Sequence, residues 1–131
     1  MVKDLVGTRS AGLAIRIGIG LAGGGAIATV DNLASGGEVS PIVVVAMLLA
    51  ASAAAGVVWD RDGWVAAAAT WVCVPAAHLV KHLLGLPDTL QPNTYVSIAK
   101  LAAFTLAIAA IGAGGGVWLR RLWNGGASGP R

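Results

Sequence analysis

The sequence predicts an all-α integral membrane protein, a single four-helix bundle with both termini on the cytoplasmic side. Three observations predict it: 56% of the 131 residues are hydrophobic, only 11% are charged, and turn residues divide the chain into four long apolar segments. Soluble proteins carry about 25% charged residues. Because about 20 residues cross a hydrocarbon core of roughly 30 Å, residues 1–131 form one domain with room for four crossings and short loops.

The four apolar segments are expected at residues 12–30, 41–59, 64–86 and 95–119. The first segment is expected to close at Asp31, Asn32, Ser35, Gly36 and Gly37. Pro41, which follows a serine, is typical of the first position of a helix. Asn93 or Thr94 is available to cap the last helix through a side-chain oxygen. Each segment is therefore bounded by residues that favour a turn or a helix end.

The basic residues predict the orientation in the membrane. Two lysines lie near one side, and seven basic residues lie at the termini and in the turn 60–63: Lys3, Arg9, Arg16, Arg61, Arg120, Arg121 and Arg131. Cytoplasmic loops carry an excess of lysine and arginine, so this side is expected in the cytoplasm. Dispersed basic residues do not favour a nucleic-acid partner. The abundance of alanine and glycine is associated with GC-rich bacterial genomes, so we expect a bacterial plasma (inner) membrane.

A cleavable signal peptide is the alternative interpretation of the first segment. Lys3, Arg9 and Arg16 precede an apolar stretch that ends in small residues, including Ala26 and Ala28. Residues 12–30 are long for the apolar region of a signal peptide. Cleavage would also leave the two ends of the remaining chain on opposite sides of the membrane, so the two interpretations differ in topology.

Small residues predict close packing of the helices. On the first segment they recur every four residues on one face and on a neighbouring face: Ala14, Gly18, Ala22 and Ala26, and Gly20 with Gly24. Such spacing allows the backbones of membrane helices to approach each other closely. Gly18, Gly20, Ala22 and Gly24 are therefore the candidate packing residues. They either pack the helices of one subunit or, on the first helix, build a homo-oligomer or a larger membrane complex.

The third segment carries the candidate polar site. Trp71, Pro75, His78 and His82 fall along one helical stripe, with Lys81 beside it. Pro75 removes a backbone N–H, so a kink or a freed carbonyl is expected there. An ionisable residue inside a membrane is a functional hypothesis by default, because burying it is costly without a partner. The candidate ion, proton or ligand site comprises His78, Lys81, His82, Lys100 and Asp31, with Glu38 and Asp88 as further possible partners.

Several kinds of chemistry remain open for this cluster. His78 and His82 face one metal only if Asp31 or Asp88 completes the ligands, so we expect no metal. Two histidines on one helix do not favour bis-histidine haem ligation, and no cofactor is expected. A proton relay, or binding of an anionic or quinone-like headgroup with Lys81 and Lys100, is a further alternative. In the structural alternative, Lys81 and His82 are solvated at the interface and His78 bonds a helix carbonyl.

Motifs of catalysis are absent from the sequence. It contains no nucleophile elbow, phosphate loop or paired inward carboxylates, and residues 18–23 match a dinucleotide-binding glycine pattern only inside an apolar helix. The inverted-repeat signature of a transporter is also missing. We therefore expect a non-catalytic, self-associating or accessory membrane subunit. The alternative is a small ion- or proton-coupled transporter or channel that uses the His/Lys cluster.

Overall fold

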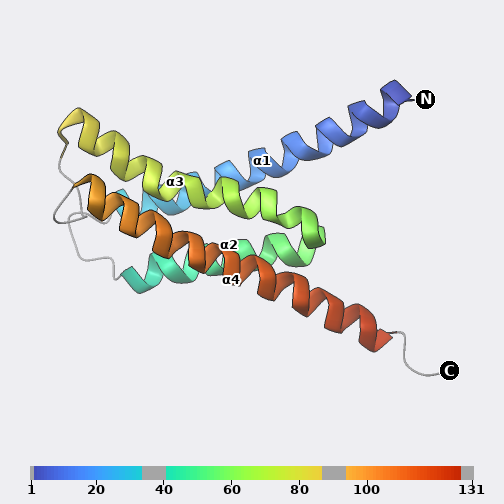
Figure 1. Ribbon diagram of the computed structural model, residues 1–131. Helices are drawn as coiled ribbons and strands as arrows, with labels where there is room; N and C mark the ends of the chain where they lie inside the picture. The colour runs from blue at the N-terminus through green and yellow to red at the C-terminus, as the bar shows by residue number, and fades with distance from the viewer. Residues whose placement is uncertain (1, 34–40, 87–93, 128–131) are drawn as a thin grey trace.

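The protein is all-α in the computed structural model, which describes residues 2–33, 41–86 and 94–127. The helices of the described part are, in order, α1 (Val2–Leu33), α2 (Pro41–Trp59), the short 3₁₀ helix η2 (Asp60–Asp62), α3 (Gly63–Leu84) and α4 (Tyr95–Ala127). In Figure 1 the start of α1 and the end of α4 project from the same end of the molecule, where η2 joins α2 to α3. The opposite end holds the end of α3 and the start of α4.

Three helical stretches of the described chain are long and apolar enough to cross a membrane: Arg9–Asp31, Ile42–Leu84 and Tyr95–Gly126. The expectation of four separate stretches is corrected to three. The reason is that the charged turn between the second and third segments is itself helical, so α2, η2 and α3 follow one another without a break. The chain nevertheless reverses there, at Asp60, whose φ of 55° is left-handed. Gly63 consequently packs against the backbone of Ala55 and Gly56.

The closest helix contacts join parallel helices, α1 with α3 and α2 with α4. Along α1 and α3, Gly20 lies against Ala66 and Gly24 against Thr70, so residue numbers rise together on both helices. On α2 and α4, Gly112 meets Leu49, and Gly56 and Gly116 each meet the backbone of the facing helix. A Cβ at Gly112 would lie 2.8 Å from the Leu49 carbonyl oxygen. Glycine is needed at these crossings because the backbones themselves touch.

The core is small, and many large apolar side chains point outward. Ile27, Leu48, Val74 and Ala109 form the buried cluster. Many of the largest hydrophobic residues are instead exposed, among them Phe104, which is 56% exposed. Alanine and glycine occupy many of the other buried positions, such as Ala66, Ala113 and Gly20. Large side chains that point outward are opposite to the usual pattern of a water-soluble protein. The arrangement is compatible with a membrane protein, in which lipid tails cover the outer side chains.

The helix ends agree in part with the sequence-based expectations. Thr94 caps α4, because its Oγ1 accepts a hydrogen bond of 3.2 Å from the backbone N–H of Ser97. Pro41 is the first residue of α2, as expected. The first helix, α1, ends at Leu33, within the run 31–37 that was expected to close it. Asn93 and the residue before Pro41 lie outside the described residues.

The helices continue through Pro75 and through the glycines 114–116. Pro75 lies inside α3, which runs on through it. Gly114, Gly115 and Gly116 lie inside α4, which extends to Ala127 instead of ending near residue 119. Packing explains the regular backbone at Gly116, since contact with α2 offsets the low helix propensity of glycine.

Candidate functional site

His78 faces the interior of the helix assembly. It lies on the stripe of α3 that also carries the buried residues Thr70, Val74 and Pro75. Only 5% of its surface is exposed. The sequence placed His78 on this stripe, and the packing of α3 against α1 and α4 makes the stripe an interior one.

Asp31 is the carboxylate that the structure places beside His78. Its Oδ2 lies 3.2 Å from the His78 Nε2, and the side chains are 21% and 6% exposed. The continuation of α1 through Asp31 and the parallel alignment of α1 with α3 create this contact. A carboxylate oxygen at this distance accepts a hydrogen bond from the imidazole N–H. The pair therefore joins the end of α1 to α3 through two polar side chains inside the protein.

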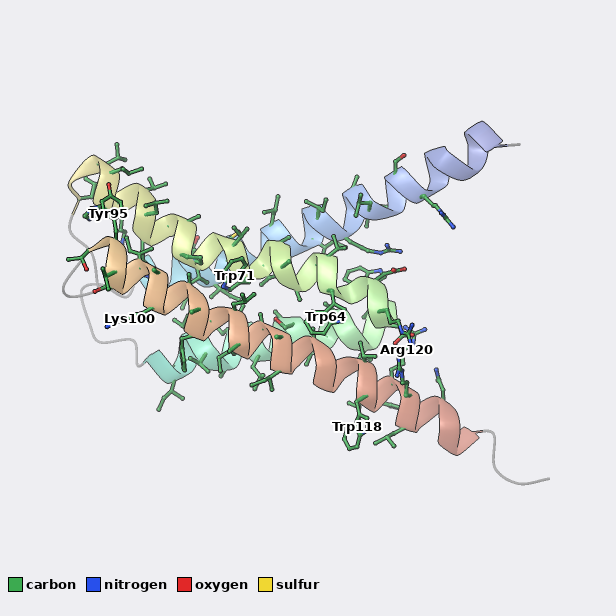
Figure 2. All side chains as sticks on the ribbon, in the orientation of Figure 1. Trp64, Trp71, Tyr95, Lys100, Trp118 and Arg120 are labelled. Atoms are coloured by element: carbon green, nitrogen blue, oxygen red, sulfur yellow. The ribbon has the colours of Figure 1, made fainter. Side chains whose placement is uncertain are left out.

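Other members of the expected cluster occupy the same end of the molecule. The His82 ring contacts the Tyr95 ring edge to face, with centroids 4.4 Å apart and an angle of 71°. Lys81 is half-buried in the last turn of α3, and Lys100 is exposed on α4. Figure 2 shows Tyr95 and Lys100 at the end of the molecule opposite Arg120. The five residues therefore share one end, but only His78 and Asp31 form an interior pair.

The described residues contain no group of three or more histidine, cysteine, aspartate or glutamate side chains that could hold a metal ion. His78 and His82 turn toward different neighbours, α1 and α4 respectively. The other proposed partners, Glu38 and Asp88, lie outside the described residues. Within the described part, the chemistry available at this end is proton exchange and hydrogen bonding.

A second polar contact joins α3 to α4 about two turns before His78. The Trp71 indole N–H is 3.0 Å from the carbonyl oxygen of Ala102 and 3.1 Å from Thr105 Oγ1. Thr105 in turn donates to the Leu101 carbonyl at 2.7 Å. Sequence reasoning placed Trp71 on the stripe but missed Thr105. A buried tryptophan usually finds a partner for its N–H, so a search for hydroxyl residues on the next helix could have found it.

Polar side chains also join α1 to α3 near the middle of the two helices. The Thr70 hydroxyl lies 3.0 Å from the Gly20 carbonyl oxygen and 2.8 Å from that of Ala66. The Cys73 thiol, the single cysteine, lies 3.4 Å from the Ala69 carbonyl and 3.9 Å from that of Leu21. Serine and threonine hydroxyls stabilise membrane helix pairs by such bonds.

Arginine contacts dominate the end that carries η2. Arg120 on α4 donates to the carbonyl oxygens of Val57 and Val58, at 3.0 and 2.6 Å. These are last-turn carbonyls of α2, where a positive charge complements the helix dipole. Arg16 Nη2 lies 3.5 Å from Asp62 Oδ2. Arg131 and the side chain of Lys3 lie outside the described residues.

With this geometry established, we compared the chain with known proteins. Neither a protein-family model, nor a curated protein, nor a solved structure matches it. The function therefore has to be argued from the residues alone.

The four candidate packing residues divide between two faces of α1. Gly20 and Gly24 are buried against α3, whereas Gly18 and Ala22 are exposed. A Cβ at Gly24 would lie 2.7 Å from the Cys73 Sγ, but a Cβ at Gly18 would meet nothing within 4 Å. Residues two apart on a helix point roughly 200° away from each other. One small face is thus used within the subunit, and the other is left open.

Proposed function

We propose that this chain is a non-catalytic membrane module of the bacterial plasma membrane, which crosses the bilayer four times and associates with further copies of itself through the exposed face of α1. The two middle crossings are α2 and α3. Their combined stretch of 43 residues is about twice the length that one crossing needs, and it reverses at η2. This topology puts both termini and η2 on one side.

The charges support a cytoplasmic position for that side. Arg16 contacts η2 and Arg120 contacts the end of α2, so these residues lie at the same end as Arg61 in η2 itself. Lys81 and Lys100 lie at the other end. An excess of basic residues is typical of cytoplasmic segments, which favours cytoplasmic termini.

The exposed small-residue face of α1 is the observation that carries the proposal of self-association. Ala14, Gly18, Ala22 and Ala26 are all exposed. The apolar stretch of α1 is also the one least covered by other helices. Within it 17% of the residues are buried, against 22% and 28% for the other two stretches. A face of small residues in lipid gains van der Waals contact when a second helix approaches it closely. A second copy of α1 offers such a face.

Replacement of Gly18 by isoleucine tests the interface. The side chain would point away from α3, so the fold should persist while close approach of a second α1 is blocked. We expect at least a tenfold weaker association, or ~1.4 kcal/mol, in a dilution series of fluorescently labelled protein in liposomes, read by energy transfer. Gly115→Ile is the matched control, because Gly115 is an exposed glycine on α4 with nothing within 4 Å of its Cβ position.

Each outcome decides the proposal. Loss of energy transfer in Gly18→Ile with normal transfer in Gly115→Ile supports an α1 interface. A wild-type protein that stays monomeric at every protein-to-lipid ratio removes self-association and leaves the accessory subunit of a larger complex. Equal transfer in wild type and Gly18→Ile places the interface on another helix.

A proton- or ion-coupled transporter is the second candidate, and the Asp31–His78 pair is the observation that favours it. An interior pair of a carboxylate and an imidazole is suited to take up and release a proton. Proton flux into proteoliposomes under an imposed gradient is the test. If protons pass through this site, the flux is lost in Asp31→Asn and in His78→Gln. The flux is retained in the control Lys100→Gln, because Lys100 is exposed. Flux unchanged by the first two variants rejects this candidate.

A further inference from the structure

Two adjoining hollows open along one face of α1. The first is lined by Arg9, Gly12, Leu13 and Arg16 of α1 and by Asp62 of η2. The second begins at Ile19, one turn further along α1. Their α1 residues follow one another at intervals of three or four, so they lie on the same side of the helix. This side differs from the exposed face that carries Gly18.

The second hollow is an apolar groove between α1 and α2. Those two helices contact each other only sparsely, and the groove has a volume of about 270 Å³. Gly20 and Gly23 line it on α1, Val58 and Trp59 line it on α2, and Ala66 and Thr70 line it on α3. Because these residues lie within apolar stretches, a hydrocarbon chain is the material that fills the groove in a bilayer.

The first hollow is positively charged and lies next to this groove along α1. Two arginines and one carboxylate line it, which leaves one net positive charge. The Arg16–Asp62 contact of 3.5 Å is longer than the 2.7–2.9 Å of a charge-assisted hydrogen bond. The Arg16 Nε is buried and has no hydrogen-bond partner among the described residues. The Arg16 guanidinium therefore keeps a buried donor available to a further acceptor.

We propose that this face binds one anionic phospholipid, with its phosphate at Arg9 and Arg16 and one acyl chain in the groove between α1 and α2. Arg9 and Arg16 lie seven residues apart, about 10 Å along the helix, so a headgroup phosphate fits between them. Basic sites between membrane helices at the cytoplasmic side are suited to anionic headgroups. This inference rests on the membrane embedding proposed above and is independent of self-association.

Trp59 provides the probe, because it lines the groove. The protein is reconstituted with phosphatidylglycerol or phosphatidylcholine that carries brominated chains, which quench tryptophan fluorescence on contact. The Trp59 contribution is the difference between wild type and Trp59→Phe. We expect Trp59 to prefer phosphatidylglycerol about fivefold, the ratio expected for one basic residue's attraction to an anionic lipid. Inorganic phosphate should not compete.

Two variants separate the headgroup from the chain. Arg9→Gln with Arg16→Gln should abolish the preference, while Arg121→Gln, an exposed arginine at the same end, should leave it unchanged. Gly23→Leu should fill the groove and reduce the quenching of Trp59 by both lipids. Its Cβ would meet only Thr70 Oγ1, at 3.8 Å, so the fold tolerates it.

The contradicting results are also distinct. Equal quenching by the two lipids, or a preference that survives loss of both arginines, overturns the anionic lipid site. Competition by inorganic phosphate would assign the arginines to a free anion instead and overturn it as well. Absence of quenching at every tryptophan, including the exposed Trp118, would mean that the protein is not embedded and would overturn both this site and the membrane topology.

Discussion

Replacement of Gly116 by alanine should destabilise the protein, although alanine is the better helix former. Gly116 lies where α4 crosses α2, and a Cβ there would collide with the carbonyl oxygen, carbonyl carbon and Cα of Ala53. All three atoms belong to the backbone, so a rotamer change cannot relieve the collision. The two helices must separate along their shared interface.

The neighbouring Gly115 supplies the matched control, since a Cβ there meets nothing within 4 Å. Gly115→Ala should gain up to ~1 kcal/mol from helix propensity. Gly116→Ala gains the same amount but loses about 1–3 kcal/mol through overpacking. The two variants should therefore differ by about 1–3 kcal/mol in the free energy of unfolding, with Gly116→Ala the less stable.

Unfolding in mixed micelles of dodecyl maltoside and sodium dodecyl sulfate measures this difference. Tryptophan fluorescence reports the transition, because Trp71 sits between α3 and α4 (Figure 2) and loses its partners on unfolding. Equal stability of Gly115→Ala and Gly116→Ala would refute the reasoning. It would mean that α2 and α4 are not held at backbone contact.

Three further predictions concern single contacts, and each is measured by unfolding in the same mixed micelles. For Trp71→Phe, which lacks the Trp71 reporter, far-ultraviolet circular dichroism follows the transition. Trp71→Phe removes the indole N–H that bonds Ala102 and should cost about 0.5–1.5 kcal/mol. Arg120→Gln loses a charged donor to Val58 and should cost about 1 kcal/mol, reduced at high salt. Gly85→Ala forces a side chain into the left-handed conformation that ends α3, with φ 66°, and should cost about 1–2 kcal/mol. No loss of stability in any one variant contradicts the role of that contact.

The helical organisation was largely predictable because it depends on local composition. Long apolar segments favour helices, and Pro41 and Thr94 mark helix starts through their own backbone and side-chain chemistry. The charged turn 60–63 was recognised, but its 3₁₀ geometry was not. As a result the number of separate apolar stretches was wrong, since a short helical turn and a loop have similar sequences.

The sequence predicted which residues belong to the candidate site, but not which of them contact each other. Periodicity placed His78 and His82 on one stripe of the same helix. It could not show that His78 turns to Asp31 while His82 turns to Tyr95, because those contacts depend on how far α1 extends and on which helices adjoin α3. Three carboxylates and one lysine were candidate partners for His78 (Asp31, Glu38, Asp88 and Lys100), and the alignment of α1 with α3 places Asp31 beside it.

By itself, the sequence determined that the chain is helical, apolar and built with small-residue faces, because these properties follow from each segment's own residues. Only the tertiary structure decided that the parallel pairs α1–α3 and α2–α4 make the closest contacts. It also decided that Gly20 is buried while Gly18 is free. Every helix carries several small faces that pack equally well in isolation, so the choice between them depends on the fit of all the helices together.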